Sequence, residues 1–297
     1  MVERPMPSTA VVADTTSYLP RELLDQYDVK EVSLYVGLEG EQEPEADIAD
    51  LHAFYERLRA SDQQVTTSQP SVGDFISVYE PLLEEGKEII SIHLSSGISG
   101  TCESAMQARE RLTADGKGGE RIAVCDSRTG AGGMGLMVLA AAAAAEAGAG
   151  AAEALERAEG ARKELKIWFA VDTLDYLRRG GRIGAARAWI GTTLKIKPIL
   201  TLEEEITPIE RVRTRSRAFE RMVDYGRQRH EAGADAWVVQ HVQDPETAER
   251  LIEACEPIFG SDPVFTSEVG PVIGAHVGPG LLGIGGVSRA ALEYSAR

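Results

Sequence analysis

Short apolar runs alternate with amphipathic stretches along the first half of the chain. Runs rich in β-branched residues predict buried strands, and stretches with helical periodicity predict helices between them. The predicted strands are residues 9–13, 29–36, 89–94 and 122–125, and the predicted helices are residues 20–27, 48–60, 71–85, 99–112 and 130–147. Ser71 and Asp74 have the spacing of a capping box at the start of one helix. This β–α alternation is typical of a parallel sheet covered by helices on both faces.

The second half has a different order of elements. The predicted strands are residues 166–171, 194–200, 206–212, 237–241, 264–269 and 273–277, and the predicted helices are residues 151–165, 216–230 and 245–259. Three consecutive glutamates, 203–205, mark a turn between two neighbouring strands, so this sheet is expected to be mixed. We therefore predict an α/β chain of two domains: a parallel-sheet, Rossmann-like domain at residues 1–165 and a mixed-sheet α+β domain at residues 166–297.

The acidic balance of the chain limits its partners. The formal net charge is −16 at pH 7, from 47 acidic and 31 basic side chains. Such a surface repels nucleic acid and anionic lipid, so no nucleic-acid partner is expected. One stretch reverses the sign: residues 178–217 hold ten Lys or Arg and four Glu, a local charge of +6. This stretch is either an ordinary solvated surface or a docking site for an acidic partner.

Cysteine usage and the start of the chain favour a cytoplasmic protein. Cys102, Cys125 and Cys255 are odd in number and lie far apart without C-x-x-C spacing, so neither a disulfide framework nor a zinc site is expected. Residues 1–8 lack the apolar core of a signal peptide. No stretch offers about 18 consecutive strongly apolar residues, the length that a membrane span needs.

Hydroxyl side chains gather in three loops, each expected between a strand and a helix. These loops are residues 14–17, 66–70 and 95–101, and their candidate ligand-binding residues are Thr67, Ser68, Ser95 and Ser96. Ligands of open parallel sheets bind beyond the carboxyl ends of the strands, and the first N–H groups of a helix favour an anion. The alternative is that these hydroxyls only cap helices. Convergence of three loops favours an anion site.

Motifs for catalysis are weak, so no catalytic residue and no metal ligand is predicted. The chain lacks G-x-S-x-G, H-E-x-x-H and a phosphate-binding P-loop. Residues 130–135 and 278–283 match G-x-G-x-x-G, but the first is separated from its strand and the second is too near the C-terminus for a βαβ unit. His276 precedes the turn Gly278–Pro279–Gly280, where backbone can approach a ligand closely. We expect His276 to lie near the ligand.

At these residues the chain resembles the DegV family, the fatty-acid-binding subunits of the bacterial fatty-acid kinase system. The resemblance covers nearly the whole chain. It is carried, in order, by the segments at residues 67–71 (TSQPS), 95–101 (SSGISGT), 172–183 (DTLDYLRRGGRI), 194–200 (LKIKPIL) and 276–280 (HVGPG). The Gly-rich helix start at Gly130 departs from the family pattern.

The resemblance implies a role as a carrier and not as an enzyme. It implies that an acyl chain lies in an apolar tunnel between the two domains, and that no other cofactor is bound. It implies that Thr67 and the Ser95–Ser96 pair hold the carboxylate, with His276 close by, and leaves open which serine points inward. A partner kinase would convert the carboxylate to an acyl phosphate, and Arg178, Arg179 and Arg182 would face that kinase. Transient contact with a membrane surface follows from the same role.

Physical chemistry is consistent with this role. Each buried CH₂ contributes roughly 0.8 kcal/mol, so about fifteen methylenes contribute on the order of 12 kcal/mol before entropic costs. Hydroxyl and backbone donors offset the cost of burying the carboxylate. Two other interpretations remain: an α/β enzyme or sensor that binds a small phosphorylated or nucleotide ligand, and an interaction module that docks an acidic partner without any ligand.

Overall fold

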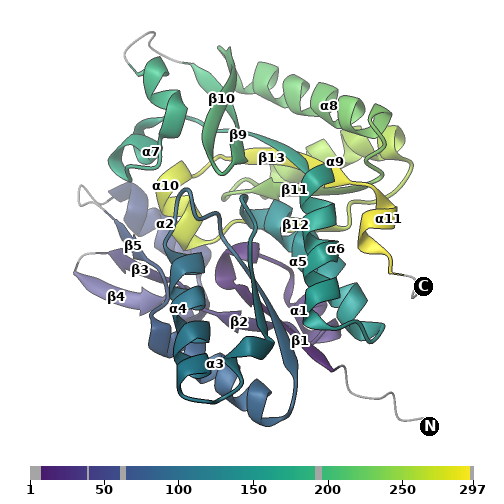
Figure 1. Cartoon of the computed structure of the whole chain (residues 1–297). Helices are drawn as coiled ribbons and strands as arrows, with labels where there is room; N and C mark the ends of the chain where they lie inside the picture. Colours follow the sequence, from purple (N-terminus) through teal and green to yellow (C-terminus); the bar gives the residue numbers. More distant parts are fainter. Residues whose placement is uncertain (1–7, 39, 61–64, 191–195, 295–297) are drawn as a thin grey trace.

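The computed structural model describes residues 8–38, 40–60, 65–190 and 196–294. Figure 1 shows two sheets stacked with helices between and outside them. The helices are α1 (Arg21–Gln26), α2 (Leu51–Ala60), α3 (Val72–Glu84), α4 (Thr101–Ala114), α5 (Ala131–Glu146), α6 (Ala151–Glu164), α7 (Asp175–Arg179), α8 (Arg215–Glu231), α9 (Pro245–Phe259), α10 (Pro271–Val277) and α11 (Arg289–Leu292). Short 3₁₀ helices are η1 (Thr15–Ser17), η2 (Glu45–Asp47), η3 (Gly119–Arg121) and η4 (Gly184–Trp189).

The first sheet is parallel, as predicted. It has the order β2-β1-β6-β7 and consists of β1 (Thr9–Asp14), β2 (Lys30–Val32), β6 (Glu88–His93) and β7 (Ile122–Asp126). Every residue of β1 is buried, as a central strand covered on both faces requires. Helices α3 and α4 pack on one face of this sheet, and α5 and α6 on the other. The capping box of Ser71 and Asp74 opens α3 as expected.

The second sheet is mixed and has six strands in the order β10-β9-β8-β13-β11-β12. Its strands are β8 (Lys166–Ala170), β9 (Lys197–Glu203), β10 (Glu205–Val212), β11 (Ala236–His241), β12 (Phe265–Glu268) and β13 (Leu282–Val287). Among the described strands of this sheet, only β11 and β12 pair in parallel. Helices α8 and α9 cover its outer face, and α5 lies against the inner face. The expected strand 194–200 begins at Lys197, and its residues 194 and 195 lie outside the described residues.

Two predictions near the C-terminus were wrong. Residues 273–277 are not a strand but part of α10, which Pro271 opens. A short apolar run does not distinguish a strand from a fully buried helix, and α10 is apolar because it packs into the core. The central strand β13 was missed because three of its six residues are glycines, which are rare in strands. At one of these positions a larger residue does not fit, because a Cβ on Gly285 would lie 2.6 Å from the carbonyl oxygen of Lys166.

A small third sheet also departs from the prediction. It has the order β4-β3-β5 and consists of β3 (Tyr35–Leu38), β4 (Glu41–Pro44) and β5 (Thr66–Ser68). The single strand expected at 29–36 is divided, because β2 belongs to the parallel sheet and β3 to this one. The hydroxyl loop expected at 66–70 begins as strand β5, antiparallel to β3.

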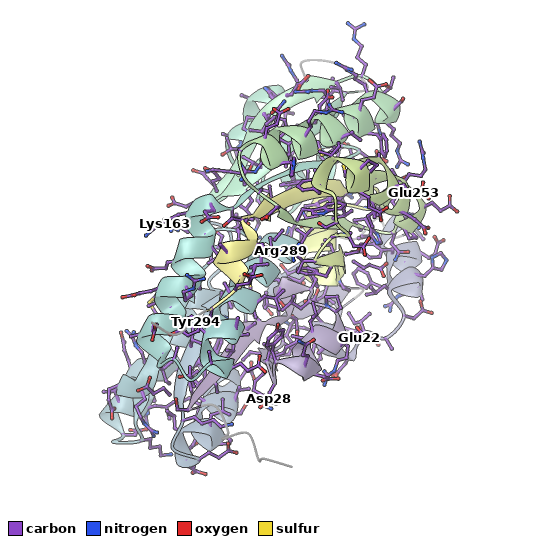
Figure 2. The ribbon with its side chains drawn as sticks, turned by 90° about the vertical axis from the view of Figure 1, so that its right-hand side faces the viewer. Glu22, Asp28, Lys163, Glu253, Arg289 and Tyr294 are labelled. Atoms are coloured by element: carbon purple, nitrogen blue, oxygen red, sulfur yellow. The ribbon has the colours of Figure 1, made fainter. Side chains whose placement is uncertain are left out.

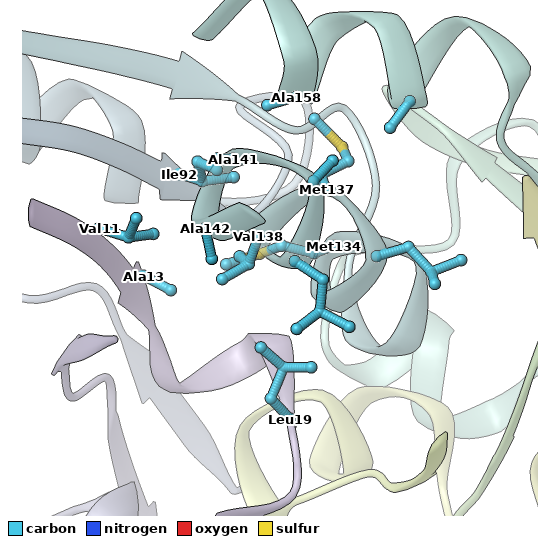
Figure 3. Packing of buried hydrophobic residues seen from close by; sticks show 14 of the residues in the cluster. Val11, Ala13, Leu19, Ile92, Met134, Met137, Val138, Ala141, Ala142 and Ala158 are labelled. Carbon is cyan, nitrogen blue, oxygen red and sulfur yellow. The ribbon is translucent and has the colours of Figure 1, made fainter. Parts of the chain in front are cut away.

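Helix α5 joins the two large sheets into one core. Its alanines and methionines cluster with Val11, Ala13 and Ile92 of the parallel sheet (Figure 3). The same cluster includes Val238 and Phe265 of the mixed sheet. The helix is apolar on all sides because it has a sheet on each side. The glycines at its start allow this close packing. A Cβ on Gly135, for example, would lie 2.7 Å from the ring of Phe265.

Neither of the two large sheets, nor the small third sheet, combines described strands from before residue 165 with strands from after it. The domain boundary at residues 165 and 166 stays a prediction, since α5 contributes to both cores. Acidic side chains such as Glu22, Asp28 and Glu253 project from the surface (Figure 2). Among the described residues, no helix combines the length and apolar character that crossing a membrane requires.

Candidate functional site

A narrow, largely apolar cavity lies between the two large sheets. The centre of a water-sized sphere can reach about 70 Å³ inside it, and the space between the surrounding protein atoms is about 830 Å³ when open solvent at the mouth is counted. The apolar lining comes from every layer around it and comprises Leu34, Leu94, Ile98, Ala131, Ile167, Phe169, Leu177, Leu202, Ile206, Val269, Val272, Ile273, Val277 and Leu281. The polar lining residues are Thr67, Ser68, Gln69, Ser99, Thr129, Arg182, Gln240 and His276. Such a slot suits a slender apolar ligand with one polar end.

Thr67 and His276 meet at the wall of this cavity. Thr67 lies on β5, whose pairing with β3 fixes its position, and His276 lies in the last turn of α10. The Thr67 hydroxyl and Nε2 of His276 are 2.8 Å apart, within hydrogen-bond distance. The sequence places these residues more than 200 positions apart, so only the packing of α10 against β5 brings them together.

The imidazole of His276 is neutral at pH 7. Burial, together with the smaller effect of the nearby positive charge of Arg182, lowers its pKa to about 4. The ring lies directly over Gly180, where a Cβ would be 2.0 Å from Nδ1. Nδ1 is buried and has no hydrogen-bond partner among the described residues. His276 therefore contributes a hydrogen-bonding group without charge, and Gly180 makes room for it.

Arg182 supplies the positive charge of the site. It is half-buried and lines the cavity, and it donates hydrogen bonds to the carbonyl oxygens of Gly180 at 2.8 Å and Ile98 at 3.3 Å. No carboxylate pairs with Arg182 in the part of the chain that the structure describes. Its charge is therefore available to an anion in the cavity.

Arg178 and Arg179 have a different environment from Arg182. Both are exposed at the end of α7. Arg178 lies 3.5 Å from the carboxylate of Asp175, and the Arg179 guanidinium stacks over the ring of Tyr176. The three arginines expected to act together therefore divide: two lie on the surface and the third lies in the cavity wall.

Of the three predicted serines, Ser68 lies at the cavity, and Ser95 and Ser96 do not. Ser68 lines the cavity, where its hydroxyl accepts a hydrogen bond of 2.6 Å from Gln42. The Ser95 hydroxyl donates to the carbonyl oxygen of Glu204 at 2.6 Å, and the Ser96 hydroxyl donates to the carboxylate of Asp126. Neither Ser95 nor Ser96 is among the lining residues.

The physical reason is the close packing of the β9–β10 turn on this loop. A Cβ on Gly97 would lie 2.3 Å from the carbonyl oxygen of Glu204, so the loop and the turn are in direct contact. The Ser95 hydroxyl then bonds across this contact instead of pointing into the cavity. The structure thus brings Thr67, Ser68, His276 and Arg182 together at the cavity, and it places the hydroxyls of Ser95 and Ser96 elsewhere.

Four polar lining residues were not predicted: Gln69, Ser99, Thr129 and Gln240. Ser99 belongs to the predicted hydroxyl loop, but the pattern did not distinguish it from its neighbours. Gln240 had a usable signal, since it is a lone amide in the apolar run of β11 and is buried there. Buried amides require partners, which makes such a residue a candidate for a site.

The site offers hydrogen-bonding groups and one positive charge. No group of three His, Cys, Asp or Glu within the described ranges is arranged to hold a metal ion. The three cysteines are buried, and burial raises the pKa of the Cys125 thiol to about 12, so none is a reactive thiolate. This arrangement is able to hold the anionic end of an apolar molecule.

Nearly the whole chain is similar to proteins of one family. A family model described as an uncharacterised protein of the DegV family matches residues 8–289. Protein DegV of Bacillus subtilis is 35% identical over 280 residues, which are 93% of this chain and 97% of that protein. A DegV domain-containing protein of Streptomyces coelicolor is 38% identical over 278 residues, covering 93% of this chain and 96% of the relative.

Solved structures agree with these sequence relatives. A fatty-acid-binding DegV family protein from Thermus thermophilus is 33% identical with a TM-score of 0.84, covering 94% of this chain and 99% of that one. DegV from Bacillus subtilis, described as a fatty acid binding protein, is 33% identical with a TM-score of 0.83, covering 95% of this chain and 99% of that one.

Proposed function

This chain belongs to the DegV family, and we propose that it binds one long-chain fatty acid in the cavity between its two large sheets. The observation that carries the proposal is an apolar slot with Thr67, His276 and Arg182 on its wall. Fatty-acid binding by the similar proteins from Thermus thermophilus and Bacillus subtilis supports it. The acyl chain supplies affinity by burial, and the polar groups orient the carboxylate.

The head group in this proposal is held by Arg182 and by the hydroxyls of Thr67 and Ser68. His276 stays neutral and exchanges a hydrogen bond with Thr67, so it orients that hydroxyl and does not compete as a second cation. Ser95 and Ser96 are not part of the proposed head-group site, because their hydroxyls bond to Glu204 and Asp126. The largely apolar lining does not favour the alternative of a small phosphorylated or nucleotide ligand.

Native mass spectrometry of the purified chain tests fatty-acid binding. We expect a mass increment of one long-chain fatty acid, which organic extraction removes and addition of the acid restores. A chain that carries no lipid and takes up none after extraction would contradict the proposal.

We further propose that the bound carboxylate is presented to a partner kinase. One carboxylate oxygen attacks the γ-phosphorus of ATP held by the kinase, and ADP leaves, which yields an acyl phosphate and ADP. Such transfers depend mostly on positioning and on stabilising the developing negative charge. Arg182 in the cavity wall is suited to the second task, and the exposed Arg178 and Arg179 on α7 are suited to docking.

Trapping the acyl phosphate with hydroxylamine tests the kinase proposal. With kinase and ATP, the loaded chain is expected to yield acyl hydroxamate. Charge reversal of Arg178 and Arg179 should slow this reaction at unchanged fatty-acid affinity. Equal rates for the variant and the wild type would remove these two arginines from the docking surface.

Transient contact with a membrane surface is part of the same proposal. Ile190 and Ile209 are exposed by 41% and 37%, and Arg187 and Arg211 lie beside them on η4 and β10, which pack together. Isoleucine and arginine side chains together suit an anionic lipid surface.

Fatty-acid transfer from vesicles tests this contact. Transfer should be faster from vesicles of phosphatidylglycerol than from vesicles of phosphatidylcholine, and replacing Ile190 and Ile209 by Ser should reduce the transfer rate.

A further inference from the structure

A second group of polar side chains lies on another wall of the cavity. Thr67 and His276 come from β5 and α10, whereas Thr129 and Gln240 lie where the start of α5 packs against β11. Both residues line the slot among Leu94, Ile167 and Phe169. A plain hydrocarbon chain gives such groups nothing to bond with, so their presence in an apolar slot requires an explanation.

Gln240 is held in one orientation. It is 4% exposed, and its neighbours across the sheet are Gly283 and then Phe169, in one row of side chains. Because Gly283 lacks a side chain, the amide of Gln240 lies across it; a Cβ there would be 2.9 Å from Nε2. Oε1 accepts a hydrogen bond of 3.2 Å from the N–H of Gly132. Because only the amide oxygen can accept this bond, it identifies which end of the amide is Oε1, and Nε2 is left as a donor.

Thr129 adds a second group. It is 1% exposed, and its Oγ1 is buried with no hydrogen-bond partner among the described residues. It directly precedes Gly130, the N-cap of the 16-residue helix α5, which has no side chain of its own to cap the helix. Gly130 and Ala131 themselves line the cavity, and the N–H of Gly132 is bonded to Oε1 of Gln240. A buried hydroxyl without a hydrogen-bond partner destabilises the folded chain, and a ligand oxygen that bonds to it would remove this cost.

We propose that these groups recognise an oxygen on the acyl chain itself, so that the preferred ligand is a hydroxy fatty acid. This inference rests on the proposed fatty-acid binding. A hydroxyl on the chain accepts from Nε2 of Gln240 and exchanges a hydrogen bond with Oγ1 of Thr129, and both partners are then satisfied. A site built for such bonds disfavours the analogue that lacks the hydroxyl. A cis double bond offers only a weak π acceptor and does not satisfy them.

Competition for the delipidated full chain tests the inference. A fluorescent fatty acid is displaced by stearic acid and by stearic acids that carry one hydroxyl at successive positions. At one position the hydroxyl is expected to tighten binding about five- to tenfold over stearic acid. In the variants Thr129→Val and Gln240→Met this preference should disappear, so that the hydroxylated acid and stearic acid displace the probe equally well.

Thr201→Val is the matched control. Thr201 is buried and donates a hydrogen bond to Ile167, but it does not line the cavity, so this variant should keep the preference. If stearic acid displaces the probe as well as every hydroxylated isomer, the inference is wrong and the proposed function stands. If no fatty acid displaces the probe, both fail. The wild-type comparison decides even where a variant does not fold.

Discussion

Two residues of the site carry complementary electrostatic roles. His276 is neutral at pH 7 because it is buried and because Arg182 is near, whereas Arg182 contributes a guanidinium group. A bound carboxylate therefore meets one positive charge and neutral hydrogen-bonding groups. The discrimination between a carboxylate and a neutral head group should then depend on Arg182 alone among the three arginines of this segment.

We predict that Arg182→Gln weakens binding of a long-chain fatty acid by about 10- to 100-fold, the range of a charge-assisted hydrogen bond. Binding of the corresponding fatty alcohol should change little. Arg178→Gln is the control, since Arg178 is exposed and pairs with Asp175. Calorimetry with both ligands measures the difference. An equal loss for acid and alcohol would show that Arg182 acts through packing and not through charge.

At the scale of elements, a buried glutamate ties the small sheet to the helix that carries His276. Glu45, at the start of η2, accepts hydrogen bonds from Thr15 at 2.6 Å, Tyr18 at 2.7 Å and the N–H of Val272 in α10 at 2.8 Å. Burial raises its pKa to about 7, although these three bonds lower it. Between pH 4.5 and about pH 7, Glu45 is therefore mostly protonated and neutral in the folded state, and mostly ionised in the unfolded state.

The sign of the pH effect follows from this shift. Glu45 stabilises the fold fully below its unfolded pKa near 4.5 and loses that contribution as pH rises through about 7. Glu45→Gln cannot ionise, so its stability relative to wild type should improve between pH 5 and pH 8, by on the order of 3 kcal/mol. Urea unfolding at each pH measures it. Exposed Glu43→Gln is the control, and a pH-independent difference for Glu45→Gln would refute the assignment.

At the scale of the whole molecule, the β9–β10 turn of the mixed sheet is hydrogen-bonded to loops of the parallel sheet, a contact that we call the latch. The Ser95 hydroxyl donates to the carbonyl oxygen of Glu204, and the Glu204 N–H donates to the carbonyl oxygen of Arg128 at 3.1 Å. Leu202 and Ile206, which flank this turn, line the cavity. The contact therefore holds one wall of the cavity in place.

Ser95→Ala removes the side-chain bond of this latch. We expect dissociation of a bound fatty acid to become about fivefold faster, the effect of one lost hydrogen bond. The preference for acid over alcohol should be unchanged. A stopped-flow chase with excess unlabelled fatty acid measures the rate. Loss of the acid preference in this variant would instead return Ser95 to the head-group site that the resemblance implied.

Much of this architecture could be read from local patterns. The buried strands β1, β6 and β11 and the helices α3, α8 and α9 have strong periodicities, and these patterns predicted them within a few residues. The hydroxyl loops and His276 directed attention to the correct region, because strand ends and glycine turns are encoded locally. The resemblance added the acyl ligand, which no local pattern specifies.

The pattern of apolar and polar residues did not predict the direction in which each side chain points. Whether Ser95 bonds to a ligand or to Glu204, and whether Arg182 lies in a wall or on a surface, depends on segments about 110 and 85 positions away. The glycine-rich β13 became a central strand and the apolar residues 273–277 became a helix, since long-range packing overrode weak local preference. The periodicity of apolar residues shows which positions are buried in the core. A binding site depends instead on which side chains lie close together, and this is decided by contacts between segments that are distant in the sequence.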